Sequence, residues 1–376
     1  MAQKIVFLIN SLTGGGAERV MATLLRHSET LKGEADVHLV LLDDEPRAYS
    51  VPSWVRLTQL NAQGSLLKSY VQTRRLFKQL RPDLCLSFLT RSNVVNALLQ
   101  PLGHHVIMSE RVNTSAHLGT GVAGQFARFL VRKTYPTARA VICVSSGVAE
   151  DLIANFGVDT SRTHTIANPI DAEAIARRAH CAAQTGAPSR PYYVAMGRFV
   201  ETKNFGLLLT AFAKADLDAD LVLLGDGPLR PALEAQIQAL KLDDRISLPG
   251  FQDNPFPIIQ RARAFVLSSN AEGFPNALVE AMSLSVPVIA TNCASGPSEI
   301  LAHCSRETIS FPNKAAHGLL IPCNDPAALA NALEMLEDQD RRCGLAKQAH
   351  LRARDFTPDK AAHAYWQVVH DALEAA

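Results

Sequence analysis

The strongest constraint on the fold is a set of short apolar runs that alternate with helical stretches. In the first half of the chain these runs cover residues 5–9, 37–42, 84–89, 106–108 and 140–144. Each run is too short for a buried helix, and the first is followed by a glycine turn and a helical segment. Continuous apolar strands are buried on both faces, which is typical of a parallel sheet with helices on either side.

The pattern pauses at Asn168-Pro169-Ile170-Asp171 and then starts again. The second set of apolar runs covers residues 192–196, 220–224, 246–248, 264–267 and 286–290. Both sets open with a strand, a glycine turn and a helix. We therefore predict an α/β protein with two successive Rossmann-like domains, residues 1–167 and 168–355, followed by a final helix.

Composition points to a cytoplasmic protein. The 376 residues suffice for two domains, and the seven cysteines include no C-x-x-C pair, which argues for reduced thiols and against structural zinc. The apolar stretch at residues 5–9 is too short for a signal peptide. No apolar run approaches the ~18–20 residues that span a bilayer, so we expect any membrane to be touched only from outside.

Charge is spread unevenly, although the net charge is only +1. Residues 1–167 hold 18 Lys and Arg against 12 Asp and Glu, whereas residues 168–376 hold 19 against 24. This suits an N-terminal half that meets something anionic. Segment 126–135 mixes aromatic residues with three cations, and helix 66–80 carries four more. A basic amphipathic face for anionic lipid and an ordinary domain helix both fit these segments.

Two carboxylates, Glu272 and Glu280, stand eight residues apart with Gly-Phe-Pro-Asn between them. Pro275 suits the first turn of a helix, whose free N–H groups and dipole attract an anion. Glu272 would lie on the preceding loop and Glu280 inside the helix, within reach of the same ligand. This combination suits a sugar nucleotide, with amides for the diphosphate and carboxylates for hydroxyls.

A second pair of charged residues, Arg198 and Lys203, follows the first strand of the second half. Arginine can bind two phosphate oxygens at once, and lysine supplies a point charge. Two fixed cations stabilise the negative charge that builds on a departing diphosphate. A merely solvated face is the alternative reading of this pair.

A glycine-rich turn, Gly14-Gly15-Gly16, follows the first strand and opens the first helix, where glycines allow a ligand close to the backbone. The dinucleotide fingerprint Gly-x-Gly-x-x-Gly fails at its third position, which is Arg19. A dinucleotide-dependent oxidoreductase and a plain tight turn remain alternatives. No partnered His/Cys cluster indicates a metal, and we expect no nucleic acid partner.

Together these segments resemble the GT-B glycosyltransferases of family 4. The resemblance rests on four segments, which are Gly14–Gly16, Gly197-Arg198 with Lys203-Asn204, Gly225-Asp226-Gly227-Pro228, and Glu272-Gly273-Phe274-Pro275 with Glu280-Ala281. It implies two Rossmann-like domains that face each other across a cleft. The acceptor domain would be residues 1–167, with helix 356–376 packing back on it, and the donor domain residues 168–355.

The resemblance also implies roles for individual residues. Arg198 and Lys203 would hold the diphosphate as principal catalytic groups, and Glu272 would face the donor sugar. The donor-binding residues that it implies are Gly15, Gly16, Gly197, Gly225, Gly227, Gly273, Phe274, Asn276, Ala277, Leu278 and Glu280, of which Glu280 would bind the ribose.

One position departs from the family. Many members carry a histidine near the donor sugar, after a strand such as 106–108, where this chain reads Ser109-Glu110-Arg111. Either Glu110 takes the catalytic role of that histidine, or Arg111 binds a phosphate of the acceptor. We retain Glu110 as a fourth catalytic candidate.

The function implied by the resemblance is retaining sugar transfer without a metal or other cofactor. We expect a hexose or N-acetylhexosamine from a nucleotide-diphosphate donor, with UDP as the carrier. The expected acceptor is a hydroxyl of a polyprenyl-diphosphate-linked saccharide or a lipopolysaccharide core, at the inner face of the cytoplasmic membrane. A soluble acceptor is the alternative.

Overall fold

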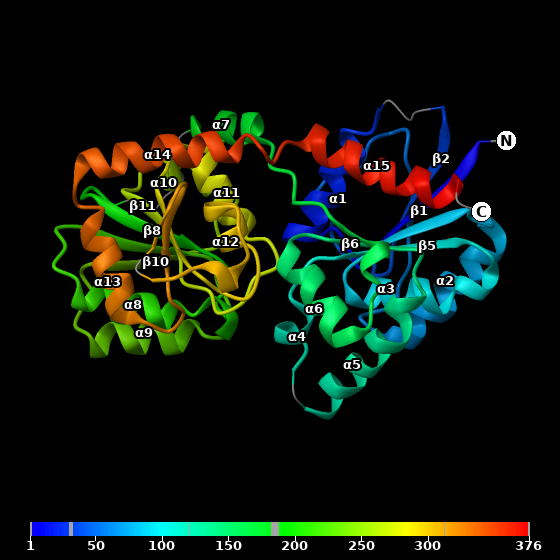
Figure 1. The fold of residues 1–376 in the computed structure, drawn as a ribbon, viewed down its shortest axis with the longest axis horizontal. Coiled ribbons are helices and arrows are strands. Elements are labelled where there is room, and N and C mark those ends of the chain that lie inside the picture. Colours follow the sequence, from blue (N-terminus) through cyan, green and yellow to red (C-terminus); the bar gives the residue numbers. More distant parts are fainter. Residues whose placement is uncertain (1, 30–32, 120, 182–187, 312, 375–376) are drawn as a thin grey trace. The chain divides into compact units, whose positions relative to one another are not determined.

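The computed structural model describes residues 2–29, 33–119, 121–181, 188–311 and 313–374. The chain divides into two compact units (Figure 1). Unit 1 comprises Met1–Pro169 and Pro358–Ala376, and unit 2 comprises Ile170–Thr357. The divisions lie two residues from the boundaries expected at 167/168 and 355/356.

Unit 1 contains a seven-stranded sheet of order β3-β2-β1-β4-β5-β6-β7. Every pair of neighbouring strands is parallel, as the continuous apolar runs predicted. The strands are β1 (Gln3–Ile9), β2 (Ala35–Leu41), β3 (Arg56–Gln59), β4 (Leu84–Phe88), β5 (His105–Glu110), β6 (Ala140–Cys143) and β7 (Thr163–Thr165).

Helices cover both faces of this sheet. They are α1 (Gly16–Arg26), α2 (Leu66–Leu80), α3 (Thr90–Leu98), α4 (Thr114–His117), α5 (Val122–Thr134), α6 (Ser146–Phe156) and α15 (Pro358–Glu374). Successive residues of β1 point to opposite faces, so Phe7 joins one core cluster and Leu8 another. Phe7 packs edge-on against Trp366 of α15, with ring centroids 5.8 Å apart.

The final helix lies on the same side of the sheet as α1 (Figure 1). It begins at Pro358 rather than at residue 356, since proline is favoured in the first helical turn and phenylalanine and threonine precede it in unit 2. Residues 375–376 of the expected helix lie outside the described residues.

Unit 2 contains a second seven-stranded sheet of order β10-β9-β8-β11-β12-β14-β13. Among its described strands, the edge strand β13 alone is antiparallel, and it pairs with β14. The strands are β8 (Tyr192–Met196), β9 (Asp220–Leu224), β10 (Ile246–Gly250), β11 (Ala264–Leu267), β12 (Val288–Thr291), β13 (Asn313–Ala315) and β14 (Gly318–Ile321). The predicted α/β fold with two Rossmann-like domains is confirmed.

Helices again lie on both sides of the unit 2 sheet (Figure 1). They are α7 (Ala172–Ala179), α8 (Phe205–Lys214), α9 (Arg230–Ala239), α10 (Phe256–Gln260), α11 (Asn276–Ser283), α12 (Pro297–Ala302), α13 (Pro326–Met335) and α14 (Gln339–Ala353). Tyr193 and Phe212 are fully buried between β8, α8 and α13. This core fixes the strands whose carboxyl ends carry the charged residues described next.

Candidate active site

The loop after β8 carries the expected cations. A 3₁₀ turn, Glu201–Lys203, leads to Asn204, whose φ of 45° places it in the left-handed region that asparagine tolerates. The Asn204 side chain caps α8 by accepting from the Leu207 amide at 3.3 Å. Arg198 is exposed, and its side chain has no hydrogen bond or ion pair with any residue that the structure describes.

Lys203 pairs with Glu272 across two neighbouring strand ends. Lys203 Nζ lies 2.5 Å from Glu272 Oε1, and β8 and β11, which precede the two residues, are hydrogen-bonded neighbours. The Lys203 side chain is 25% exposed and that of Glu272 9%. A Cβ placed on Gly197 would lie 3.4 Å from Lys203 Cδ, so the lysine methylenes pack against that glycine. The pair therefore faces the carboxyl edge of the sheet, where ligands of open α/β sheets bind.

Hydroxyl groups hold this pair in place. Ser269 Oγ donates to Glu272 Oε1 at 2.6 Å, and Ser268 Oγ donates to the Lys203 carbonyl at 2.9 Å. Thr291 Oγ1 donates in turn to the Ser269 carbonyl at 2.5 Å. Both bonds to the Glu272 carboxylate use Oε1, which leaves Oε2 without a hydrogen-bond partner in the described parts of the chain.

Asn204 also connects three loops of unit 2. Its Nδ2 donates to Asn270 Oδ1 at 3.0 Å and to Asn324 Oδ1 at 3.1 Å, so the loops after β8, β11 and β14 are held together. Sequence reasoning missed the serines, Thr291 and these asparagines. The signal for the serines was present, because Ser268-Ser269 directly follows an apolar strand run.

Glu280 lies in α11 and is 1% exposed. The helix begins at Asn276, so Pro275 precedes it instead of occupying its first turn. The Leu278 amide donates to the Pro275 carbonyl at 3.0 Å and is therefore already used at the helix start. Phe274 packs edge-on against Phe356, with ring centroids 5.3 Å apart, which fixes the Gly273-Phe274 backbone before the helix.

The glycines after β9 are required by packing. Gly225 has a φ of +129°, and a Cβ there would lie 2.0 Å from the Gly197 carbonyl oxygen. A Cβ on Gly227 would lie 2.6 Å from the Phe199 carbonyl oxygen. Gly197, Gly225 and Gly227 therefore let two loops of the carboxyl edge touch through their backbones.

In unit 1, the glycine turn lies exposed at the start of α1. Gly15 is the residue immediately before the helix and Gly16 is its first residue. A Cβ on Gly15 would lie 2.2 Å from Glu18 Oε2, so the glutamate carboxylate folds back over the helix start. Burial raises the pKa of this carboxyl, while its own backbone amide and Arg111 act in the opposite direction.

Glu110 is fully buried at the end of β5. The Tyr135 hydroxyl donates to Oε2, and the Arg111 amide donates to Oε1 at 2.9 Å. Burial raises the pKa of Glu110 and that of Tyr135. Because both carboxylate oxygens are bonded inside unit 1, this geometry gives no support to the predicted catalytic role of Glu110.

Arg111 is also buried, and its guanidinium is bonded within unit 1. It donates to the Tyr365 hydroxyl at 2.6 Å, to Ser109 Oγ at 3.2 Å and to Asn168 Oδ1, and it lies over the Phe88 ring. Burial lowers its pKa. Arg111 therefore links β5 to α15 and to the segment before unit 2. These bonds disfavour the alternative that Arg111 binds a phosphate of the acceptor.

Only part of the basic aromatic segment 126–135, on α5 and the turn after it, is exposed where a lipid surface could contact it. Phe126 and Phe129 are 59% and 53% exposed. Arg128, however, donates to two backbone carbonyls, and Tyr135 is fully buried against Glu110, so neither contributes to an open face.

No described helix is both long and apolar enough to cross a bilayer. Within the described ranges, no three His, Cys, Asp or Glu residues gather as a metal site would need.

Comparison with known proteins gives two family matches in chain order. Residues 14–174 match the model described as Glycosyltransferase Family 4, and residues 177–353 match Glycosyl transferases group 1. Both expected halves of the chain are therefore recognised as parts of one kind of enzyme, and the oxidoreductase alternative is wrong.

Two curated relatives from Campylobacter jejuni match almost the full chain. One is N-acetylgalactosamine-N,N'-diacetylbacillosaminyl-diphospho-undecaprenol 4-alpha-N-acetylgalactosaminyltransferase, 29% identical over 96% of this chain and 97% of its own. The other is GalNAc-alpha-(1->4)-GalNAc-alpha-(1->3)-diNAcBac-PP-undecaprenol alpha-1,4-N-acetyl-D-galactosaminyltransferase, 26% identical over 94% of both chains. A solved structure of Anabaena HepE with UDP is 19% identical, covers 98% of this chain and 100% of its own, and has a TM-score of 0.77, which shows a common fold.

Proposed function

We propose a reaction for this chain from the premise that it belongs to glycosyltransferase family 4 and has the GT-B fold. It transfers a hexose or N-acetylhexosamine, with retention of configuration, from a UDP-linked donor to a hydroxyl of a polyprenyl-diphosphate-linked saccharide. A lipopolysaccharide core is the second acceptor of the same class. The observation that carries this proposal is the Lys203–Glu272 pair at the carboxyl edge of unit 2.

The two residues of this pair bind different parts of the donor, Lys203 the diphosphate and Glu272 the sugar. Lys203 and Arg198 bind the diphosphate and stabilise the charge that develops as the bond from the anomeric carbon to the phosphate oxygen breaks. Glu272 accepts a sugar hydroxyl through Oε2, since Oε1 is occupied by Lys203 and Ser269. Glu280 binds the ribose hydroxyls, and the Gly273 and Phe274 amides face the sugar.

The acceptor hydroxyl attacks on the face from which the phosphate leaves. Its oxygen forms the new bond to the anomeric carbon, and its proton passes to the departing phosphate oxygen, so UDP is released and the anomeric configuration is retained. No protein nucleophile is required. The two cations supply the positive charge, and we propose that turnover needs no metal ion; activity that survives EDTA would support this, and loss of activity that Mg²⁺ or Mn²⁺ restores would contradict it.

The relatives narrow the donor and acceptor within this class. Both Campylobacter proteins are named for transfer of N-acetylgalactosamine to a diphospho-undecaprenol saccharide, and they match this chain over nearly its full length. HepE was solved with UDP. We therefore propose UDP-N-acetylgalactosamine as the first donor to test, and a diphospho-undecaprenol saccharide as the first acceptor.

A lipid-linked acceptor requires the enzyme to work at a membrane surface. We propose that unit 1 docks on anionic lipid through α5, where Phe126 and Phe129 are exposed beside Lys133. Vesicles with anionic lipid should sediment the wild type, and a double change of Phe126→Ser and Phe129→Ser should release it. Leu351→Ser, at an exposed leucine of unit 2, is the matched control. Equal sedimentation of all three proteins would contradict this docking face.

A thermal-shift screen tests the donor class directly, because a ligand that binds only the folded state raises its melting temperature. UDP-N-acetylgalactosamine, UDP-N-acetylglucosamine, UDP-galactose and UDP-glucose are compared with GDP-mannose and ADP-glucose. We expect stabilisation by at least one UDP-sugar and not by the other two carriers. Stabilisation by GDP- or ADP-linked sugars alone would overturn the UDP assignment, and no stabilisation by any of the six would count against the function itself.

A further inference from the structure

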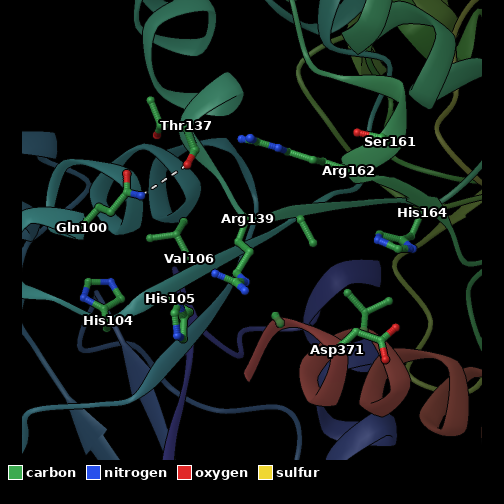
Figure 2. A pocket seen from close by; sticks show the side chains of 13 residues that line it. Gln100, His104, His105, Val106, Thr137, Arg139, Ser161, Arg162, His164 and Asp371 are labelled. Atoms are coloured by element: carbon green, nitrogen blue, oxygen red, sulfur yellow. Dashed lines mark hydrogen bonds between the residues drawn. The ribbon is translucent and has the colours of Figure 1, made fainter. Parts of the chain in front are cut away.

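Unit 1 has a cavity that the proposed reaction does not use. A cavity of about 520 Å³ opens at the amino ends of β5, β6 and β7 (Figure 2). Its wall includes His105 and Ala140 at the strand starts, and Asp371 and Ala372 of α15. Glu110 lies at the other end of β5, roughly 17 Å away at about 3.3 Å per residue. The cavity is therefore separate from the carboxyl edge, where ligands of the family fold bind.

The cavity wall is rich in cations. Figure 2 shows Arg139 and Arg162 among its lining side chains. The Arg139 guanidinium has no hydrogen bond or ion pair with any residue in the described part of the chain. Arg162 makes only two long bonds, of 3.4 Å each, to the carbonyls of Pro136 and Ala138. Partly exposed arginines that lack a carboxylate partner can bind phosphate oxygens through two parallel N–H groups.

Among the described residues, one carboxylate, Asp371, lines the cavity against these cations. Asp371 Oδ1 already accepts from Gln367 at 2.8 Å, and Asp371 has no ion pair with either arginine among the residues described. The other polar groups of the wall are mostly donors or hydroxyls, from Gln100, Thr137, Ser161 and His164. The local charge thus favours an anionic ligand.

A buried histidine supplies an unused acceptor at the same place. His104 lines the cavity, is 4% exposed, and has its Nε2 3.0 Å from Asn96 Oδ1. The Asn96 amide nitrogen donates elsewhere, so its Oδ1 accepts and His104 Nε2 carries the proton. Burial lowers the pKa of His104 to about 4, which keeps the ring neutral. His104 Nδ1 is then an acceptor without a partner in the described chain, and it is buried, so a ligand reaches it only when the surrounding side chains of the cavity wall shift.

We propose that this cavity binds a sugar phosphate, with the phosphate on Arg139 and Arg162 and a sugar hydroxyl donating to His104 Nδ1. The volume lies in the range of small-molecule sites, about 300–1,000 Å³, and exceeds what a bare phosphate needs. The site is independent of the donor site in unit 2, so it does not rest on the proposed reaction.

Isothermal titration with glucose 6-phosphate, AMP, inorganic phosphate and glucose tests the proposal. We expect glucose 6-phosphate to bind the wild type with a submillimolar Kd, inorganic phosphate to bind more weakly and glucose not to bind. Tighter binding of AMP than of glucose 6-phosphate would overturn the sugar-phosphate class in favour of a nucleotide. Lys203→Ala, which removes the proposed donor-site cation, should leave the glucose 6-phosphate affinity unchanged; loss of binding there would place the phosphate in unit 2 and overturn the proposal.

Charge-matched variants locate the site. The double change of Arg139→Gln and Arg162→Gln should weaken glucose 6-phosphate binding at least tenfold. The control changes two exposed arginines of α2, Arg74→Gln and Arg75→Gln, and should bind as the wild type does. Asp371→Asn removes the opposing carboxylate and should tighten binding. Equal affinity in the Arg139/Arg162 double variant and the control, or no binding by the wild type, would refute the proposal.

Discussion

The two units each place an acid and a base near the carboxyl edge of a parallel sheet, but they use them differently. In unit 2 the Lys203 and Glu272 side chains keep 25% and 9% of their surface exposed, and Glu272 Oε2 has no partner among the described residues. In unit 1 Glu110 is fully buried and Arg111 is 7% exposed, with bonds to neighbours on β5, α15 and the segment before unit 2.

This difference separates a pair that can bind a ligand from one that holds the fold together. Both carboxylate oxygens of Glu110 are bonded within the chain, and the one unpartnered nitrogen of Arg111, Nε, is buried, so the pair offers a substrate no accessible atom. Removing a partner of such a buried charge leaves it uncompensated. A half-open pair can exchange part of its bonding for a ligand. Each pair joins a glutamate to a basic residue, so exposure and remaining hydrogen-bonding capacity distinguish these two pairs.

The largest expected effect is a loss of stability in unit 1 when the buried Arg111 is replaced. Arg111→Met should lower the free energy of unfolding of unit 1 by about 3–5 kcal/mol, because Tyr365 and Asn168 lose the buried guanidinium that donates to them and Glu110 loses the neighbouring positive charge. Trp54 and Trp366, the only tryptophans, both lie in unit 1, so tryptophan fluorescence in urea follows that unit alone. Arg81→Met, at an exposed residue of the same unit, is the control. A loss of unfolding free energy below about 1 kcal/mol would contradict the structural role of Arg111.

Glu280→Ala tests the unit 2 side. A hydrogen bond to a charged group contributes about 1.5–3 kcal/mol, so the affinity for UDP should fall about 10- to 150-fold. Glu201→Ala, at an exposed glutamate on the loop after β8, should bind UDP as the wild type does. Unchanged UDP affinity in Glu280→Ala, measured by isothermal titration, would remove the ribose role.

The pH dependence of the free energy of unfolding tests whether the buried polar groups of unit 1 stay uncharged in the folded state. The pKa of His104 is lowered by burial from 6.5 to about 4, so its stabilising contribution is complete above pH 6.5 and is lost as the pH falls towards 4. Between pH 7 and pH 5 unit 1 should lose about 2 kcal/mol from this group. His104→Gln should abolish that part of the dependence in urea titrations followed by tryptophan fluorescence. The same slope in both proteins would show that His104 titrates normally.

Ser269→Ala should have the smallest effect. It removes one hydrogen bond to Glu272 but leaves the carboxylate paired with Lys203, so kcat/KM should fall only about fivefold, equivalent to about 1 kcal/mol. Ser269→Thr keeps the hydroxyl and should restore most of the loss, and the exposed Ser189→Ala should have no effect. A loss in Ser269→Ala that threonine does not restore would indicate a packing effect instead of positioning of the carboxylate.

The sequence predicted the sheets well where their strands are buried. The runs at 5–9 and 192–196 became β1 and β8, because apolar strands without alternation require helices on both faces. β3 and β7 were missed, since they are short, half-exposed edge strands with no apolar run. The edge strand β13 and its neighbour β14 were missed as well, although β14 is buried and apolar. Strand pairing at an edge depends on the neighbouring strand, which the local sequence does not contain.

The sequence named Lys203 and Glu272 as candidates but could not show that their side chains meet. Lys203 and Glu272 are 69 residues apart, and they meet because β8 and β11 are neighbours in the sheet. Burial was the property that the sequence could not supply. Glu110 stood in the place of a family histidine, yet β5 ends inside the unit, and Tyr135, expected on an open face, bonds to it.

The central claim is that the Lys203–Glu272 pair binds an activated sugar. The most direct test measures how fast the Lys203→Ala variant transfers sugar from UDP-N-acetylgalactosamine to a diphospho-undecaprenol saccharide. We predict a loss of about 100-fold or more in kcat, the cost of removing one group that stabilises transition-state charge. Lys214→Ala, at an exposed lysine ending α8, should retain wild-type turnover. Near wild-type turnover by Lys203→Ala, in a preparation where the wild type is active, would contradict the account.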